Sequence, residues 1–302
     1  MLDTIIVGGG PAGLSAAIYA QRALLDNVVI EKDYMGMGQI VSTERVDNYP
    51  GLYGENGYDL AEKFHKHAES LGAEFLENNV LKIEKTDKGW KIFLDNEKVL
   101  ESKTIIYCGG TNHRKLDIKG EQEFSARGIS FCAVCDGMFY KDKVTAVIGG
   151  GDTALSDALY LSKIAKKVYI IHRRDKFRAN NRLQQQVKNT ANIELILNAT
   201  PCEFIGEKLL TGIKYIQQGE EKLLECNGAF LAVGNIPNTE ILNGLVDLDK
   251  NGYIIADETG KTSAEGFFAA GDVRTKKLRQ VITAASDGAN CVESVEEYLQ
   301  TI

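Results

Sequence analysis

Short β-branched apolar runs, glycine clusters and longer alanine- and leucine-rich segments follow one another twice along the chain. The first apolar run, at 4–7, leads through a glycine cluster into an alanine- and leucine-rich segment at 14–25, and a second apolar run follows at 28–30. This order predicts a strand, a tight turn, a helix and a second strand. Since parallel neighbouring strands need a crossover helix, residues 4–31 are expected to form one β-α-β unit.

The same order of elements returns in the middle of the chain. An apolar run at 144–148 precedes three glycines at 149–151, a helical segment at 153–165 and a further apolar run at 168–171. Each β-α-β unit presents one helix N-terminus, which can bind one pyrophosphate. Two such units therefore predict two separate nucleotide sites.

The length of the chain and two further glycine-bearing segments indicate how the units are divided between domains. With 302 residues the chain is expected to form about two domains. Segments Cys108–Thr111 and Gly234–Asn238 flank the second unit, and we expect the domain boundaries there. The predicted fold class is α/β, with two Rossmann-like nucleotide-binding domains. The second domain, at 112–241, is inserted into the first, which residues 1–111 and 242–302 form together.

The first glycine cluster has the spacing of a dinucleotide-binding turn, G-x-G-x-x-G. The candidate binding residues in it are Gly8, Gly10, Pro11, Ala12 and Gly13. Eighteen residues beyond the last glycine, Glu31 ends the next apolar run, where a carboxylate binds a ribose hydroxyl. A glycine triplet on its own can be a plain tight turn, but the flanking strand, helix and acid favour a nucleotide site.

The second glycine cluster has the related spacing G-x-G-x-x-A. Its candidate binding residues are Gly149, Gly151, Asp152, Thr153 and Ala154. The strand after it ends without an acid and reads His172, Arg173 and Arg174, with Arg178 four residues further on. Guanidinium groups suit a 2′-phosphate, whereas a carboxylate suits a free 2′-hydroxyl, so this pattern favours NADPH over NADH. A solvated basic strand end is the structural alternative.

Cys132 and Cys135 form the one close cysteine pair in the sequence, and Asp136 follows the second cysteine. Such a C-x-x-C pair can be half of a zinc site, two core thiols or a redox pair. No second pair of ligands at short spacing completes a zinc site, and no metal is expected. A redox pair needs a proton donor, because cleavage of its disulfide leaves a thiolate. Asp136 is placed in sequence to supply that proton.

Composition and charge exclude several classes of protein. A formal net charge of -7 and the lack of a long basic run argue against nucleic acid as a partner. No uninterrupted apolar stretch approaches the roughly 18 residues of a membrane span, and the first residues lack the basic start of a signal peptide. Six cysteines are too few for a disulfide framework in a chain of this length. We expect a cytoplasmic protein that binds neither nucleic acid nor a membrane.

In combination, these features resemble the low-molecular-weight thioredoxin reductases, which are bacterial flavoprotein disulfide reductases. The resemblance covers essentially the whole chain, with both fingerprints present and the cysteine pair just before the second. The further matching segments are Arg178–Ala179, Gly271–Arg274, Arg279–Val281 and Thr283–Ala285. The resemblance implies a domain for FAD built from both chain ends, an inserted domain for NADPH, a homodimer, and thioredoxin as the partner.

The resemblance also implies roles for residues outside the fingerprints. Asp272 matches the aspartate that holds the ribityl hydroxyls of FAD, and Val80 matches an adenine contact. Two further sets match segments beside the flavin ring, which are Arg279, Gln280 and Val281 in one and Gln39, Thr43 and Asn48 in the other. Arg127 corresponds to a position that meets the thioredoxin partner. Each of these could instead be an ordinary loop or capping residue.

Three places depart from the commonest family pattern. Met37 stands in a loop that usually reads Gly-Gly-Gln, Cys108–Gly110 replace an Ala-Thr-Gly turn, and Ser156-Asp157 replace two glutamates. The last change touches the helix near the expected nicotinamide path. It leaves the electron donor open between NADPH and, as in some relatives, reduced ferredoxin. The three arginines argue for NADPH.

The resemblance implies that electrons pass from NADPH through FAD and the Cys132–Cys135 dithiol to oxidised thioredoxin. Because the cysteine pair and the NADPH site belong to the same inserted domain and both must reach one flavin, that domain is expected to rotate. Its hinges would be the glycine-bearing segments at 109–113 and 234–238. Alternatives are an NAD(P)H oxidase or peroxiredoxin-system reductase, and a non-enzymatic flavin redox sensor.

Overall fold

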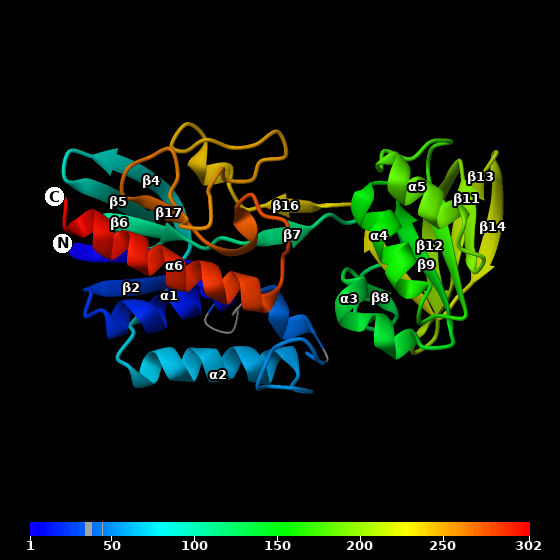
Figure 1. Cartoon of the computed structure of the whole chain (residues 1–302), viewed down its shortest axis with the longest axis horizontal. Coiled ribbons are helices and arrows are strands. Elements are labelled where there is room, and N and C mark those ends of the chain that lie inside the picture. The colour runs from blue at the N-terminus through cyan, green and yellow to red at the C-terminus, as the bar shows by residue number, and fades with distance from the viewer. Residues whose placement is uncertain (34–37, 44) are drawn as a thin grey trace. The chain divides into compact units, whose positions relative to one another are not determined.

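A computed structural model describes residues 1–33, 38–43 and 45–302 of the chain (Figure 1). Met37 lies outside the described residues. The chain forms two compact units. We call Met1–Asn112 together with Ile236–Ile302 the outer unit, and His113–Asn235 the inserted unit. Each unit contains a β-sheet with parallel strands at its centre and helices on one face, so the predicted α/β class with two Rossmann-like folds is confirmed.

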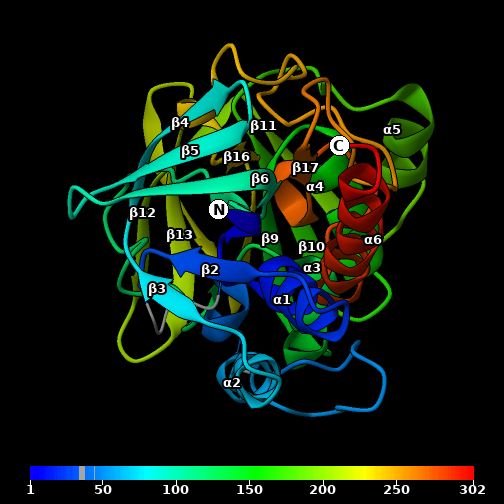
Figure 2. The ribbon, with the colours of Figure 1, turned by 90° about the vertical axis from the view of Figure 1, so that its left-hand side faces the viewer.

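The sheet of the outer unit has its strands in the order β3-β2-β1-β6-β5-β4, with β17 also paired to β6 (Figure 2). Its parallel strands are β1 (Leu2–Val7), β2 (Asn27–Glu31), β3 (Phe75–Glu77) and β17 (Phe267–Ala269). β6 (Val99–Tyr107) pairs with β1 and β17 near its C-terminal end, while its N-terminal half pairs antiparallel with β5 (Gly89–Leu94), which pairs with β4 (Val80–Thr86). The carboxyl ends of β1, β2, β6 and β17 therefore share one edge, where α/β proteins bind ligands.

The two faces of this sheet are covered differently because side chains alternate along each strand. The helices and 3-10 turns of the unit are α1 (Pro11–Arg22), α2 (Gly57–Ser70), α6 (Val281–Leu299), η1 (Gln39–Ser42), η3 (Glu240–Leu242) and η4 (Gly271–Val273). Ile6 packs with the helices, whereas Ile5 lies in the core cluster that includes Trp90. α1 packs tightly against α6, since a Cβ on Gly288 would lie 2.0 Å from the Ala12 carbonyl oxygen. This packing fixes α6 against the helix that starts at the first fingerprint.

The inserted unit has a five-stranded parallel sheet in the order β11-β10-β9-β15-β8. Its strands are β8 (Ile129–Ser130), β9 (Val144–Gly149), β10 (Lys167–His172), β11 (Ile193–Leu197) and β15 (Gly228–Ala232). One face is covered by α4 (Asp152–Leu161) and α5 (Asn181–Lys188), and the other by an antiparallel sheet of β12 (Ala199–Gly206), β13 (Leu210–Gln217) and β14 (Glu220–Glu225). The short helix α3 (Ala133–Asp136) and the 3-10 turn η2 (Gly137–Tyr140) lead from β8 to β9. Both faces of the parallel sheet are thereby buried, as is usual for such sheets.

Both predicted β-α-β units are confirmed, with differences at the helix ends. The first helix begins at Pro11, before the predicted start at 14, because proline suits the first turn of a helix. It ends at Arg22 rather than at 25, since Leu24 has a left-handed backbone conformation with φ of 57°. The second helix likewise ends at Leu161, before the predicted end at 165.

The chain passes between the two units twice, through β7 (Thr111–His113) and β16 (Asn235–Pro237), and these two strands pair with each other. Glycines with positive φ precede both strands, Gly110 at 63° and Gly234 at 107°. Such conformations cost glycine little and other residues much more. The two connections lie in the glycine-bearing segments where the sequence predicts hinges.

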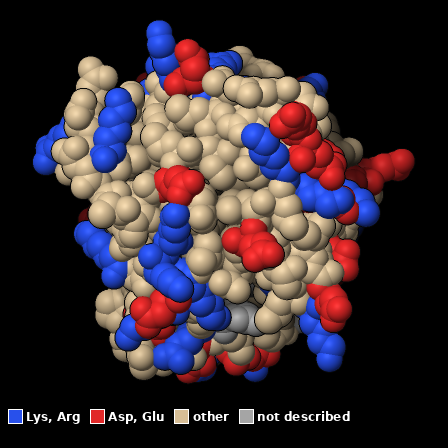
Figure 3. Space-filling view, turned by 90° about the vertical axis from the view of Figure 1, so that its right-hand side faces the viewer, with Lys and Arg blue, Asp and Glu red and all other residues tan. Residues whose placement is uncertain are grey.

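One face of the molecule carries charged side chains of both signs (Figure 3). On the face shown in Figure 3, Lys and Arg side chains are interspersed with Asp and Glu. Because neither sign of charge dominates this face, a charged ligand would have to bind there through individual side chains of opposite charge. Within the described part of the chain, no helix combines the length and the apolar character that crossing a bilayer requires.

Candidate active site

The first fingerprint turn lies between the carboxyl end of β1 and the start of α1. Gly8 has φ of 108°, and a Cβ there would lie 2.4 Å from the carbonyl oxygen of Cys108. A Cβ on Gly13 would lie 1.8 Å from the Gly8 carbonyl oxygen. At the N-cap of α1, Gly10 has no side chain to cap the helix, and Pro11 begins it. The glycines thus let strand and helix approach closely and leave the first turn of α1 without a side-chain cap, which suits a phosphate group.

Glu31 and the start of β4 lie beside this turn. The Glu31 carboxylate accepts hydrogen bonds from the amides of Gly9 (2.5 Å) and Lys32 (2.7 Å). The Asn78 amide, two residues before Val80, donates to the Glu31 carbonyl oxygen at 2.9 Å. The structure therefore brings the first fingerprint, the acid and the backbone next to Val80 to one end of the sheet.

Asp272 lies in η4, directly after β17, and is half-buried. Burial raises the pKa of its carboxyl group, an effect that the positive charges of Lys276 and Arg279 oppose. Its Oδ1 atom is buried without a hydrogen-bond partner among the residues that the structure describes. Burying an unpaired polar oxygen is costly, so this atom fits a ligand that donates a hydroxyl hydrogen. The ribityl hydroxyls of FAD have that chemistry.

The turn that carries Asp272 is braced by Asp287, a residue that the sequence analysis missed. Asp287 lies on α6, is 3% exposed, and accepts hydrogen bonds from the Gly271 amide (2.9 Å) and from Lys276 Nζ (2.7 Å). Arg274, which is 2% exposed, donates to both of its carboxylate oxygens, through Nε at 2.9 Å and Nη2 at 2.7 Å. The sequence signal was an acid among the small and apolar residues of the last helix.

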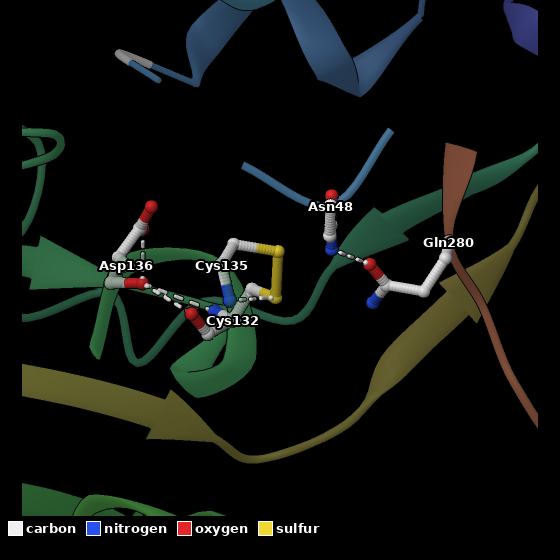
Figure 4. The surroundings of a disulfide bond; sticks show 6 residues. Asn48, Cys132, Cys135, Asp136 and Gln280 are labelled. Atoms are coloured by element: carbon white, nitrogen blue, oxygen red, sulfur yellow. Dashed lines mark hydrogen bonds between the residues drawn. A yellow bond between two sulfur atoms is a disulfide. The ribbon is translucent and has the colours of Figure 1, made fainter. Parts of the chain in front are cut away.

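The residues expected beside a flavin ring come from separate segments of the outer unit. Asn48 Nδ2 donates to Gln280 Oε1 at 2.7 Å, across a separation of 232 residues (Figure 4). Gln280 also caps α6, whose first residue is Val281. Gln39 Nε2 donates to the carbonyl and hydroxyl oxygens of Thr111. These bonds join Asn48 to the start of α6, and Gln39 to β7.

Arg279 and Thr43 hold neighbouring parts of the backbone. Arg279 Nε donates to the Asp272 carbonyl oxygen at 3.3 Å, and the guanidinium lies 4.2 Å from the centre of the Tyr253 ring. The Thr43 carbonyl oxygen accepts from the Gly57 amide at the start of α2, at 2.8 Å. These contacts give both residues a structural role, and their contact with a cofactor stays a prediction.

The second fingerprint turn is tied to the strand end that carries the basic residues. A Cβ on Gly150 would lie 2.2 Å from the His172 ring, so the buried histidine packs directly on the glycine turn. The Arg178 amide donates to the Gly150 carbonyl oxygen at 2.8 Å. Asp152 Oδ1 accepts from the backbone amide (2.8 Å) and side-chain amide (3.0 Å) of Asn180. The fingerprint and the arginine-bearing loop therefore form one structure at the start of α4, with Thr153 exposed and Ala154 buried in its first turn.

Three exposed arginines gather at this place. Burial, together with the positive charges of Arg174, Arg173 and Arg178, lowers the pKa of His172. None of the three forms an ion pair with a carboxylate of the described residues. Guanidinium groups without carboxylate partners, next to a helix N-terminus that has no side-chain cap, suit a phosphate-bearing ligand. This environment supports the sequence-based expectation of a 2′-phosphate.

Cys132 and Cys135 form a disulfide bond, with their Cα atoms 5.3 Å apart, at the start of α3 (Figure 4). A disulfide leaves no thiolate for a metal, which rules out half of a zinc site in this state. Within residues 1–33, 38–43 and 45–302, no three His, Cys, Asp or Glu side chains gather closely enough to hold a metal ion. The Cys135 amide lies 3.2 Å from Cys132 Sγ, to which it donates. This arrangement fits a redox pair.

The carboxylate of Asp136 is held by a residue that the sequence analysis did not single out. Ser130 Oγ donates to Asp136 Oδ2 at 2.6 Å. Ser130 Oγ also accepts a hydrogen bond from the Cys132 amide at 3.1 Å. Nothing in the sequence marked Ser130 beyond its place two residues before Cys132. The serine thus connects the predicted proton donor with the backbone of the redox pair.

The remaining expectations concern isolated positions. Arg127 is exposed on the inserted unit, and its carbonyl oxygen accepts from the Leu210 amide at 2.9 Å. Among the departures from the family pattern, Ser156 is exposed, whereas burial raises the pKa of Asp157 to about 7. Cys108 is buried after β6, and burial raises the pKa of its thiol. Neither change removes a group from the fingerprints or the disulfide.

Comparison with known proteins agrees with this geometry. The family model of pyridine nucleotide-disulphide oxidoreductases matches residues 2–288. A thioredoxin reductase of Listeria monocytogenes is 41% identical over 303 residues, covering 99% of this chain and 94% of the relative. One of Bacillus subtilis is 37% identical over 303 residues, covering 99% and 95%. The crystal structure of a thioredoxin reductase from Streptococcus pyogenes has a TM-score of 0.94 at 37% identity and covers 100% of this chain and 99% of that one.

Proposed function

The chain belongs to the pyridine nucleotide-disulphide oxidoreductase family, and on that basis we propose that it is an NADPH-dependent, FAD-containing thioredoxin reductase. Relatives that it matches over nearly their whole length bear that name. The observation that carries the proposal is the Cys132–Cys135 disulfide, which lies in the same unit as the arginine-bearing nucleotide turn. The reaction is NADPH + H⁺ + oxidised thioredoxin → NADP⁺ + reduced thioredoxin.

The outer unit is the proposed FAD site. The first fingerprint turn would hold the pyrophosphate at the start of α1, and Glu31 would hold a ribose hydroxyl. Asp272 would accept from the ribityl hydroxyls, a role that the unpartnered Oδ1 atom supports. Asn48, Gln280 and Arg279 would position the ring. FAD supplies two-electron transfer between the nicotinamide and the disulfide.

The inserted unit is the proposed NADPH site. The second fingerprint would hold the pyrophosphate, and Arg173, Arg174 and Arg178 would bind the 2′-phosphate. Support comes from their shared place around His172 and from the absence of carboxylate partners among the described residues. Because a guanidinium gains most from a doubly charged phosphate, these residues would select NADPH over NADH.

The disulfide is the proposed exit for the electrons. Reduction by two electrons breaks the sulfur–sulfur bond, and Asp136 gives its proton to one of the two thiolates that form. The dithiol then exchanges with the disulfide of thioredoxin through a mixed disulfide. For this exchange to run forward, the potential of the Cys132–Cys135 couple must lie near or below about −270 mV, the value for thioredoxin.

Both the dithiol and the nicotinamide must reach one flavin, and we expect the inserted unit to rotate between these tasks. The paired strands β7 and β16 are the proposed hinges, with Gly110 and Gly234 to absorb the change in backbone angles. A variant with the two units covalently locked together is expected to complete only one half-reaction. Full turnover in rapid-reaction kinetics of that variant would contradict the hinge.

The proposal extends to the surroundings of the enzyme. We expect a homodimer in the cytoplasm that takes thioredoxin or a thioredoxin-like protein as substrate, with Arg127 in contact with it. Nucleic acid and membranes are not expected partners, which the net charge of -7 supports. Size-exclusion chromatography with light scattering tests the dimer.

One comparison of electron donors tests the proposed reaction. The purified protein, loaded with FAD, is mixed anaerobically with NADPH, NADH or reduced ferredoxin, and thioredoxin is then added. We expect NADPH to bleach the flavin absorbance and thioredoxin to restore it. A protein that stays colourless after FAD supplementation contradicts the proposal. Steady oxygen consumption without thioredoxin would instead indicate an oxidase, and bleaching without recovery on any disulfide substrate would indicate a redox sensor.

A further inference from the structure

Ser130 forms a compact hydrogen-bonded arrangement with both sides of the redox motif. It ends β8 and is 5% exposed. Its Oγ atom lies 2.6 Å from Asp136 Oδ2 and 3.4 Å from the Cys132 carbonyl oxygen, and it accepts from the Cys132 amide at 3.1 Å. One buried hydroxyl therefore contacts the predicted proton donor and both backbone polar groups of the first cysteine.

The hydroxyl has a single hydrogen to share between two acceptors. While Asp136 is ionised, that hydrogen lies on the short contact to Oδ2, because a charged acceptor makes the stronger bond. Once Oδ2 is protonated, the carboxyl group donates to Ser130 Oγ, and the serine hydrogen turns to the Cys132 carbonyl oxygen. The Ser130 hydroxyl has an acceptor for its hydrogen in both states, and the hydrogen bond at the Cys132 carbonyl oxygen differs between them.

We propose that Ser130 is a positioning residue that sets the proton affinity of Asp136 and couples its ionisation to the backbone of Cys132. The proposal rests on the proposed function, in which Asp136 transfers a proton to a thiolate. In that step, Asp136–COOH + Cys–S⁻ becomes Asp136–COO⁻ + Cys–SH. The new carboxylate is stabilised by the Ser130 hydroxyl as it forms. Ser130 thus favours proton release to the sulfur when the disulfide is reduced.

Other titratable groups on the elements packed against α3 must be separated from this effect. They are Tyr140 on η2, and Asp152, Asp157 and Tyr160 on α4. Burial raises the pKa of the Asp157 carboxyl group to about 7. An Asp157→Asn variant therefore serves as the matched control.

The experiment measures the rate at which iodoacetamide alkylates the two cysteines of the reduced full-length protein as a function of pH, with the modified peptide quantified by mass spectrometry. Wild type is expected to show two apparent pKa values, the lower one linked to Asp136. Ser130→Ala is expected to raise the lower value by about one pH unit, a tenfold change in proton affinity, because the carboxylate loses its donor. Ser130→Thr keeps a hydroxyl and is expected to restore the wild-type profile.

Two further variants decide the interpretation. Asp136→Asn is expected to remove the lower titration, and adding Ser130→Ala to it is expected to change nothing more. The Asp157→Asn profile is expected to keep the Asp136-linked titration and its response to Ser130→Ala. A Ser130→Ala profile that superimposes on wild type, or an equal shift in the Asp136→Asn background, overturns the coupling. Because this readout uses neither NADPH nor thioredoxin, failure of the coupling is distinguishable from failure of the proposed reaction.

Discussion

Asp287→Asn removes one negative charge from the buried network that braces the Asp272 turn, and we expect it to destabilise the outer unit by about 3–5 kcal/mol. In the native protein the carboxylate accepts four hydrogen bonds, all within 2.9 Å, from Gly271, Arg274 and Lys276. Without it, the buried Lys276 loses its ion pair with Asp287, and among the described residues Arg274 keeps one ion pair, with Glu258, which lies 3.4 Å away and whose side chain is 87% exposed. Asparagine also points an amide donor at a cluster of donors.

Trp90 provides an assay that reports on the outer unit. It is the only tryptophan in the sequence, is 1% exposed, and packs edge-on against Phe267 at a ring-centre distance of 5.1 Å. Its emission should shift to the red when the core around it opens. With a urea m-value of about 2–3 kcal/mol/M, we expect the midpoint to fall by roughly 1–2.5 M at unchanged slope.

Glu297→Gln is the matched control, because it removes a carboxylate from the same helix at the surface. Glu297 pairs with Lys261 at 2.9 Å, with side-chain exposures of 61% and 51%. Exposed pairs contribute about 0–1 kcal/mol, so this variant is expected to unfold close to wild type. If Asp287→Asn unfolds at the same urea concentration as Glu297→Gln, the buried network does not hold the turn.

Three further predictions concern the inserted unit. Cys135→Ser is expected to leave flavin reduction by NADPH intact but to abolish thioredoxin reduction, which stopped-flow and steady-state assays separate; unchanged thioredoxin reduction would contradict the redox role. Arg174→Ala combined with Arg178→Ala is expected to raise the KM for NADPH about 10- to 100-fold and to leave that for NADH within about twofold, since each arginine contributes a charged hydrogen bond; equal losses for both nucleotides would exclude 2′-phosphate recognition. Burial raises the pKa of Asp157 from 3.8 to about 7, so the folded unit holds one more proton than the unfolded chain between these values. Stability should therefore fall as the pH rises from about 4 to 7, and Asp157→Asn should lose this slope in thermal unfolding at acid and alkaline pH; an unchanged slope would show that another group titrates.

Local patterns and steric constraints made the two β-α-β units predictable. The backbone packed around positions 8 and 13 leaves no room for a side chain. This steric constraint requires glycine at both positions, and the sequence shows it as the spacing of the glycines. Helix ends were less predictable. The first helix ends near Leu24, which has a left-handed backbone conformation although it is neither glycine nor proline. The disulfide could be expected from the short spacing of its cysteines and the family resemblance.

The groups that position the site depend on contacts made only in the folded chain. Asn48 forms a hydrogen bond with Gln280 across a separation of 232 residues, and no local sequence pattern predicts it. Ser130 is near Asp136 in sequence, but its role depends on which oxygen its hydroxyl hydrogen points to, and the sequence does not show this direction. In the sequence, Asp287 is one acidic residue on the last helix, and its role follows only from its ion pairs with Arg274 and Lys276 in the folded chain. Sequence spacing thus identified the groups expected to react, and tertiary contacts revealed the groups that orient them.

The pairing of β17 with β6 has a consequence for the order in which the protein is made. Phe267 pairs with Ile105, and the whole inserted unit, His113–Asn235, lies between these partners in the chain. During translation the inserted unit is therefore complete and free to fold while the outer sheet still lacks one of its strands. The inserted unit can therefore fold on the ribosome before the outer unit is complete. Proteolysis of nascent chains should find residues 113–235 protected first.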